Sequence, residues 1–307
     1  MKRMITVLIV LLLITGSAAA VSQVDLVILH TNDMHGRIEP DLDNAIMGMP
    51  YIAALVAQYR EQYPNVWVMD AGDTIHGRPI TDRLYGESTI EAMNMAGYDF
   101  MAPGNHDFNF GYDRLMALEE QMEFQLLAAN VYKDDVQLFT PYSVQEVAGK
   151  RVGILGLATS DTYTTTHPDN IRDLEFRDMV STAQHYVDIL RSDYGVDMVI
   201  VLGHVGFGRN YPSTDITAAV SGIDLFVDGH SHSTLPEGEM HNGTLFVQAN
   251  EYSHYLGRVY IDLSGDEPVM AASLIPAADA FAVEPVEAVV EYLAEARVEV
   301  RRRLLGN

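Results

Sequence analysis

Acidic, amide and imidazole side chains gather in five short blocks of this 307-residue sequence. Such groups are the usual ligands of divalent transition metals. One ion cannot use all of them, so the sequence predicts two adjacent ions, with the Asp73 carboxylate shared between them. The candidate ligands, in chain order, are Asp33, His35, Asp73, Asn105, His204, His230 and His232.

The spacing within two of these blocks predicts how pairs of ligands reach one ion. Asp33 and His35 are two residues apart, as are His230 and His232. Because successive side chains of an extended chain alternate between its two faces, residues i and i+2 point to the same side. We therefore expect each pair to lie in extended chain just beyond a buried strand.

This ligand set predicts hydrolysis of phosphate esters. Two cations lower the pKa of a bridging water from about 15.7 toward about 7, and the resulting hydroxide attacks phosphorus while the ions bind the phosphoryl oxygens. The mixture of nitrogen and oxygen donors favours zinc, manganese, iron or cobalt over calcium or magnesium. His106 is not needed as a ligand, so we expect it to stabilise the phosphoryl group or to protonate the leaving oxygen.

Apolar runs alternate with segments of helical periodicity, a pattern that is typical of a layered α/β fold. Each polar block follows a predicted strand, at the sheet edge where ligands gather in such folds. The predicted strands in the first part of the chain are 24–30, 66–69, 126–129, 152–158, 198–202 and 225–227. The predicted helices there are 51–63, 88–95, 112–122 and 176–194.

The last part of the chain changes character. Residues 244–249, 256–263 and 269–276 are predicted to form consecutive antiparallel strands, because their connections are short. A final helix is expected over about residues 286–305, where an acidic start and a basic end suit the helix dipole. The expected organisation is a leader (1–20), a catalytic domain (21–283) and a C-terminal helix (284–307).

Composition limits the location and the partners of the protein. Residues 1–20 combine a basic start, an aliphatic run and small residues before Val21, which predicts a cleaved secretory signal and no stable membrane span after its removal. Loss of Lys2 and Arg3 would change the formal net charge from −24 to −26. So acidic a protein is unsuited to nucleic-acid polymers, whereas two bound cations would attract a small anionic ester.

In this order, the segments ILHTNDMHG, DAGD, GNHDFNFG, GH and GHSH resemble the calcineurin-like metallophosphoesterases. More narrowly, they resemble the catalytic domain of secreted 5′-nucleotidases and 2′,3′-cyclic-nucleotide 2′-phosphodiesterases. The resemblance implies a four-layer α/β/β/α sandwich and activity on nucleotides. It would place Asp33, His35, Asp73 and His232 on one metal, and Asp73, Asn105, His204 and His230 on the other.

Two features depart from this resemblance. Asn109 stands where 5′-nucleotidases commonly carry an aspartate that supports the catalytic histidine, and Asn109 is closer to the cyclic phosphodiesterase pattern. Asp107 is then a candidate to orient His106, and we count both among the catalytic residues. The resemblance also implies a second, base-binding domain, which we do not expect after the last predicted helix.

Several alternatives stay open at this point. Arg37 and Arg209 follow ligand blocks closely enough to contact substrate, as does Asn109, and Arg78 is a further candidate. His76, which lacks ligand spacing, is expected to be structural or on the surface. The chain could instead be a non-catalytic metal- or phosphate-binding relative, or a related hydrolase of another ester.

Overall fold

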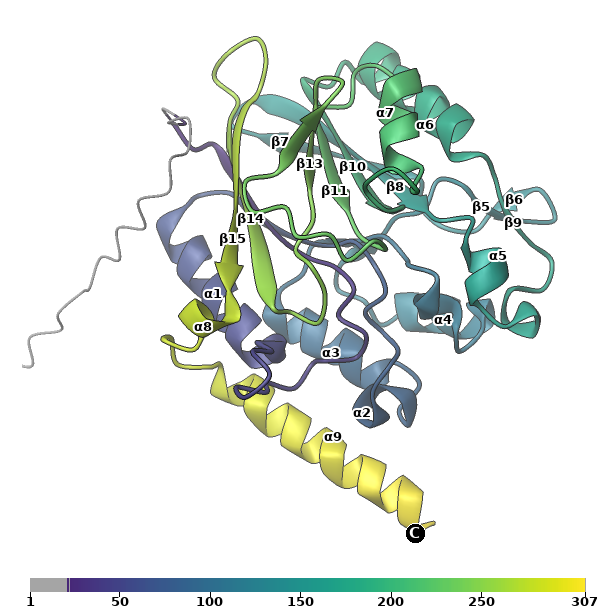
Figure 1. The fold of residues 1–307 in the computed structure, drawn as a ribbon, viewed down its shortest axis with the longest axis vertical. Helices are drawn as coiled ribbons and strands as arrows, with labels where there is room; N and C mark the ends of the chain where they lie inside the picture. Colours follow the sequence, from purple (N-terminus) through teal and green to yellow (C-terminus); the bar gives the residue numbers. More distant parts are fainter. Residues whose placement is uncertain (1–20, 22, 307) are drawn as a thin grey trace, which may run out of the picture.

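The computed structural model describes residues 21 and 23–306, so the predicted leader at 1–20 lies outside the described residues. Two six-stranded sheets lie at the centre of the molecule (Figure 1). Their strand orders are β15-β14-β1-β2-β3-β4 and β12-β13-β11-β10-β8-β7. A small third sheet has the order β6-β5-β9.

The first sheet combines strands from the first and the last part of the sequence. They are β1 (Leu26–Thr31), β2 (Val66–Asp70), β3 (Phe100–Met101), β4 (Gln125–Leu126), β14 (Tyr255–Asp262) and β15 (Val269–Pro276). The second sheet contains β7 (Tyr142–Val147), β8 (Lys150–Ala158), β10 (Met198–His204), β11 (Leu225–Asp228), β12 (Glu239–His241) and β13 (Thr244–Val247). The third contains β5 (Val131–Lys133), β6 (Val136–Gln137) and β9 (Leu174–Phe176).

Helices cover the outer faces of both large sheets. In Figure 1, α6 and α7 lie beside β8 and β10, whereas α1, α3 and α9 lie on the other side of the molecule. The α-helices are α1 (Gly48–Gln62), α2 (Pro79–Asp82), α3 (Glu87–Ala96), α4 (Tyr112–Glu119), α5 (Thr162–Thr165), α6 (Met179–Asp188), α7 (Ser213–Ala219), α8 (Ala277–Ala280) and α9 (Glu287–Leu305). Single turns of other helix types are η1 (His106–Phe108), η2 (Pro168–Ile171) and η3 (Ile189–Asp193).

Burial of both faces explains why most residues of the central strands are apolar. In β1, Leu26 and Ile28 pack between the two sheets, whereas Val27 and Leu29 pack under the helices of the first sheet. In β10, Met198, Ile200 and Leu202 face the inter-sheet core, and the residues between them face α6 and α7. A strand buried on both faces needs apolar residues at every position. The result is the predicted α/β/β/α arrangement of four layers.

Parallel pairing brings the polar blocks together. β1, β2 and β3 are parallel neighbours in the first sheet, and β10 and β11 are parallel neighbours in the second. Their carboxyl ends therefore share one edge in each sheet, and each polar block follows one of these ends. His204 is the last residue of β10, and the other candidate ligands lie in loops held by this rigid scaffold.

Two predictions about the elements were wrong. Residues 176–194 are not one helix, because Phe176 ends β9 and α6 begins at Met179. The strands at 244–249 and 256–263 do not pair, because β13 lies in the second sheet and β14 in the first. The antiparallel pairing of β14 with β15 was predicted correctly. A short connection does not force pairing when a strand can cross to the facing sheet.

The last helix, α9, packs on α1 and α3 through one apolar stripe. Its buried residues are Val289, Leu293, Ala296 and Val300. None of the helices within residues 21 and 23–306 combines the length and hydrophobicity that a membrane span requires.

His30 in β1 is a buried histidine whose Nδ1 has no hydrogen-bond partner among the described residues. It faces Gly257 across the β1–β14 pair, where a Cβ would lie 2.0 Å from the imidazole Nε2. Burial lowers the pKa of His30 from 6.5 to about 3. The folded protein therefore binds fewer protons than the unfolded chain between these pH values.

We expect His30 to make the fold sensitive to acid. Its contribution to the free energy of unfolding is complete above pH 6.5 and falls by roughly 2 kcal/mol between pH 7 and pH 5. Urea unfolding of metal-depleted protein at the two pH values should show a smaller drop for His30→Leu by about this amount. Equal drops in both proteins would contradict the assignment of a neutral buried imidazole.

Candidate metal centre

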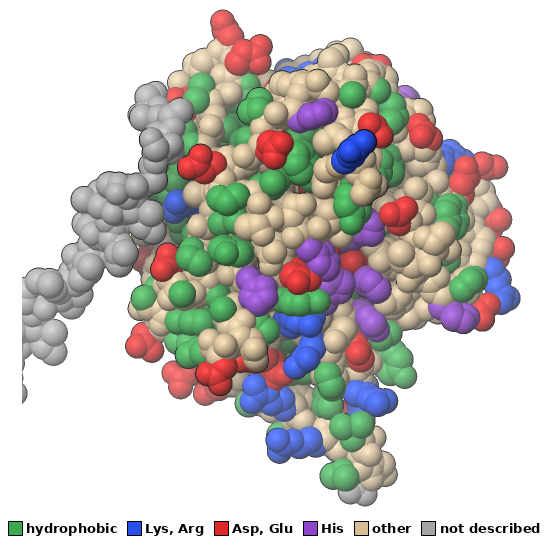
Figure 2. All heavy atoms as spheres, viewed as in Figure 1, with side chains coloured by type: hydrophobic (Ala, Val, Ile, Leu, Met, Phe, Trp, Pro, Cys, Tyr) green, Lys and Arg blue, Asp and Glu red, His purple; other side chains and the backbone are tan. Residues whose placement is uncertain are grey.

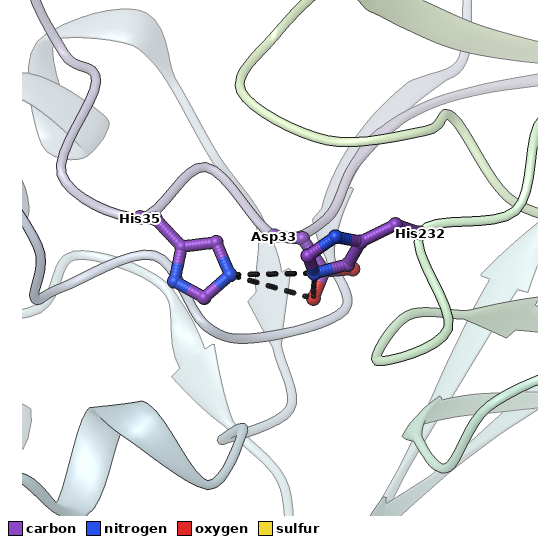
Figure 3. A group of neighbouring side chains, drawn as sticks. All are labelled: Asp33, His35 and His232. Atoms are coloured by element: carbon purple, nitrogen blue, oxygen red, sulfur yellow. Dashed lines mark hydrogen bonds and ion pairs between the residues drawn. The ribbon is translucent and has the colours of Figure 1, made fainter.

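Loops from both sheets converge on the carboxylate of Asp33, which follows β1. Its Oδ1 lies 3.2 Å from Nε2 of His232 and 3.9 Å from Nε2 of His35, and these two nitrogens are 3.4 Å apart. Figure 3 shows both imidazoles directed at the carboxylate from opposite sides. The Asp33 side chain is fully buried, so two histidines and one desolvated carboxylate can share an ion here.

A second group forms around Asp73, which follows β2. Its Oδ2 lies 3.2 Å from Nε2 of His204 and 3.9 Å from Nε2 of His35. The rings of His204 and His230 are 5.0 Å apart, and both belong with Asp73 to a cluster that could hold metal. The first group shares His35 with the surroundings of Asp73, so the two clusters are adjacent.

Asn105 provides a test of whether these residues suit a metal. Its side chain is 2% exposed, and its Oδ1 has no hydrogen-bond donor among the described residues. The neighbouring His106 N–H donates to Oδ1 of Asp73 at 2.7 Å, which ties this loop to the cluster. A buried acceptor without a donor is costly, and a cation would satisfy it. The donor set therefore fits divalent metal.

The backbone at the clustered residues differs from the extended chain that we predicted. Asp33, His35, Asp73, His230 and His232 all have positive φ, between 45° and 71°. Non-glycine residues in this region are strained by about 1–3 kcal/mol each, and such residues concentrate at functional sites. The i,i+2 pairs still point together, since Met34 between the first pair is buried in the core. Left-handed turns, not extended chain, produce this arrangement.

Asp107 explains how these turns are held. Its Oδ2 accepts the backbone N–H groups of Asp73 and Gly104, both at 2.8 Å, and its Oδ1 accepts those of Thr74 at 3.0 Å and Ile75 at 2.9 Å. Burial and the Asp73 charge raise the pKa of Asp107, while the N–H donors oppose this rise. With its oxygens engaged in this way, Asp107 does not orient His106. The predicted catalytic role of Asp107 is replaced by a positioning role.

Asp228 plays the corresponding part in the second sheet. Its Oδ1 accepts the N–H groups of Val205 at 3.0 Å, Gly206 at 2.9 Å and Gly229 at 2.8 Å. It thus joins the loop after β10 to the loop after β11. Our sequence reasoning missed Asp228, although an acidic residue at the end of an apolar strand was an available signal.

The outer nitrogens of the clustered histidines also have partners. Nδ1 of His204 lies 2.7 Å from the carbonyl of Ala71, and Nδ1 of His232 lies 2.5 Å from Oε2 of Glu251. Acceptors at Nδ1 keep the proton there and leave Nε2 free for a cation. Nε2 of His230 lies 3.0 Å from Oδ2 of Asp161. Glu251 and Asp161 were missed because nothing in their local sequence marks them.

His204 can offset the negative charge of the buried carboxylates by binding a proton. Burial opposes its protonation, but the carboxylates of Asp73 and Asp33 outweigh burial and raise the pKa of His204 to about 10. His204 in turn helps to lower the pKa of Asp73, although burial alone would raise it. Two buried carboxylates thus demand positive charge, and a metal ion would replace the proton on the imidazole.

His106 lies at the edge of this centre, with its ring 5.2 Å from that of His35. Its Nδ1 is 2.8 Å from Nδ2 of Asn109, and the same amide nitrogen is 3.2 Å from Nδ1 of His76. Nε2 of His76 lies 3.8 Å from Asp82. An amide donor at Nδ1 leaves the proton of a neutral His106 on Nε2. His76, which we expected to be merely structural, thus contacts the predicted catalytic group through Asn109.

The two arginines that were predicted to bind substrate, Arg37 and Arg209, lie in different surroundings. Arg37 donates to the carbonyl of His35 at 3.0 Å, and its guanidinium lies 3.2 Å from the ring centre of Tyr252. Arg209 is exposed in the loop between β10 and α7. Within the described part of the chain, Arg209 forms no ion pair. Figure 2 shows histidines gathered on one face, with Lys and Arg side chains next to them.

We expect Asp107→Asn to disturb the fold rather than only the chemistry. An amide nitrogen would face two of the backbone N–H donors, which should lower the free energy of unfolding by about 2–3 kcal/mol. Chemical denaturation of metal-depleted protein measures this change, with the exposed Asp266→Asn as the control. Unchanged stability in Asp107→Asn would show that its four hydrogen bonds do not support the loops.

Comparison with known proteins agrees with this geometry. Residues 26–234 match the family model of calcineurin-like phosphoesterases. The chain is 32% identical over 286 residues to protein UshA of Yersinia enterocolitica, covering 82% of this chain and 52% of that protein. It is also 32% identical over 299 residues to 5′-nucleotidase of Mus musculus, covering 84% of this chain and 51% of the relative.

Among solved structures, sulfate thiohydrolase SoxB of Thermus thermophilus has the same fold, with a TM-score of 0.83 at 19% identity over 90% of this chain and 61% of that chain. The present chain spans about half the length of the curated relatives that it matches. The family match covers strands of both large sheets and every residue of the metal clusters. The chain belongs to the calcineurin-like phosphoesterase family, whose members are metal-dependent hydrolases.

Proposed function

We propose that the protein is an exported two-metal hydrolase of nucleotides, acting as a 5′-nucleotidase or as a 2′,3′-cyclic-nucleotide phosphodiesterase. The observation that carries the proposal is the convergence of two buried carboxylates, Asp33 and Asp73, with four histidines and the unpaired Oδ1 of Asn105. Nucleotides are proposed because relatives at about half-length coverage carry the name 5′-nucleotidase.

The residues divide into two groups in this proposal. One ion would be held by Asp33, His35, Asp73 and His232, and the other by Asp73, Asn105, His204 and His230. When bound, the ions would make a water acidic enough to act as nucleophile and would offset charge on the phosphoryl group. Zinc, manganese, iron and cobalt all suit this donor set.

His106 supplies the proton in this proposal. Asn109 donates to Nδ1, so the Nε2–H of His106 is available for a phosphoryl oxygen or the leaving oxygen. Nδ1 of His76 contacts the same amide nitrogen of Asn109, and Asp82 lies beside Nε2 of His76. A hydrogen-bonded amide between two imidazoles can fix the position of His106 where the family commonly uses a carboxylate.

Export is proposed from residues 1–20 alone, whose basic start, apolar run and small residues are typical of a cleaved signal. N-terminal sequencing of the exported chain tests this, since retention of Lys2 and Arg3 would contradict cleavage.

The functional test combines an activity panel with a His106 variant. Metal-loaded protein should release phosphate from nucleoside monophosphates, or hydrolyse 2′,3′-cyclic nucleotides or bis(p-nitrophenyl) phosphate. His106→Ala should lower kcat by about 10²–10⁴-fold, because proton transfer is lost. Its metal content, measured by plasma mass spectrometry, should equal that of the wild type.

The exposed His185→Ala serves as the matched control and should retain full activity. Absence of hydrolysis with every metal would refute the enzyme proposal. Full activity in His106→Ala would refute only the role of this residue.

A further inference from the structure

Two arginines, Arg37 and Arg78, bring positive charge to a cavity next to the metal centre. Among residues 21 and 23–306, no carboxylate lies within ion-pair distance of Arg37 or of Arg78. Both line one cavity of about 340 Å³. The cavity thus brings two guanidinium groups to one place. Like charges held together favour an anionic ligand.

The acidic residues of the same cavity are already engaged. Glu39 forms an ion pair with Arg297 of α9, and Asp41 accepts hydrogen bonds from Asn44, through N–H at 3.2 Å and Nδ2 at 2.8 Å. Asp41 keeps its charge, but the three arginines of the lining outnumber its two carboxylates, so the cavity has an excess of positive charge. This is unusual in a chain of net charge −24, in which most of the surface repels anions.

The cavity is joined to the metal centre through rigid contacts. Arg37 is held by the carbonyl of His35 and by the ring of Tyr252. That ring lies 5.7 Å from the ring of His35 and 6.3 Å from that of His232. On the face drawn in Figure 2, Lys and Arg side chains adjoin the histidines. Arg37 is thus in contact with His35 of the metal centre and with Tyr252, whose ring adjoins two of the predicted ligands.

We propose that Arg37 and Arg78 bind a second phosphate group of a substrate whose other phosphate is hydrolysed at the metal centre. The substrate class is a nucleotide that carries two separate phosphate groups. This inference rests on the proposed function. A guanidinium presents paired N–H donors that match phosphate oxygens, and Arg37 loses little freedom on binding because it is already held.

The catalytic test compares a nucleoside 3′,5′-bisphosphate with the 5′-monophosphate of the same nucleoside. In Arg78→Gln, the ratio of kcat/KM for the bisphosphate to that for the monophosphate should fall about tenfold, because a charge-assisted contact is lost. Arg172→Gln, at an exposed arginine outside the cavity, should keep the wild-type ratio. An unchanged ratio in Arg78→Gln would overturn the proposal.

A binding test keeps this inference separate from the proposed activity. Inorganic pyrophosphate is titrated calorimetrically into metal-depleted protein, so that the metal centre makes no contribution. Arg78→Gln should weaken binding about tenfold, whereas Glu39→Gln, which frees Arg297 from its ion pair, should strengthen it. If the wild type does not bind pyrophosphate, or if both variants bind as Arg172→Gln does, the cavity is not a phosphate site, whatever the protein hydrolyses.

Discussion

The site depends on buried carboxylates that accept backbone N–H groups at the ends of parallel strands. Asp107 receives four such bonds from the loops that follow β2 and β3, and Asp228 receives three from those that follow β10 and β11. Loops with left-handed residues cannot use the ladder bonds of a sheet, so their N–H groups need other acceptors. These two aspartates supply them on both sides of the centre, and strained residues persist because the surroundings hold them.

Electrostatics imposes the second constraint. Asp33 and Asp73 are almost completely removed from water, and desolvated carboxylates need compensating charge. In the protein alone, the high pKa of His204 meets part of this need with a proton. Cations would meet it more fully, and they would also satisfy Oδ1 of Asn105, which has no donor in the part of the chain that the structure describes. The buried carboxylates and the Asn105 oxygen are both features that bound cations would compensate.

Much of the fold was predictable because both large sheets are buried on two faces. Residues 26–29 of β1 and 198–202 of β10 are apolar throughout, and these runs end next to the polar blocks. The partition of β13 and β14 between two sheets was not predictable, since strand pairing depends on contacts far away in sequence. The left-handed conformations of Asp33 and His35 were also missed. Side chains at positions i and i+2 point to the same side in extended chain as well, so their spacing does not reveal the backbone conformation.

At the site, the gathering of the predicted ligands could be anticipated from the strand ends, while their role as ligands stays a prediction. The supporting contacts of Glu251, Asp161 and His76 could not be predicted from the sequence, because each comes from a loop whose position is set by tertiary packing. The most direct test of the account is the number of metal ions per chain, measured by plasma mass spectrometry after loading and dialysis. Two ions in the wild type and fewer in Asp73→Asn are predicted; two ions retained by the variant, or none bound by the wild type, would contradict it.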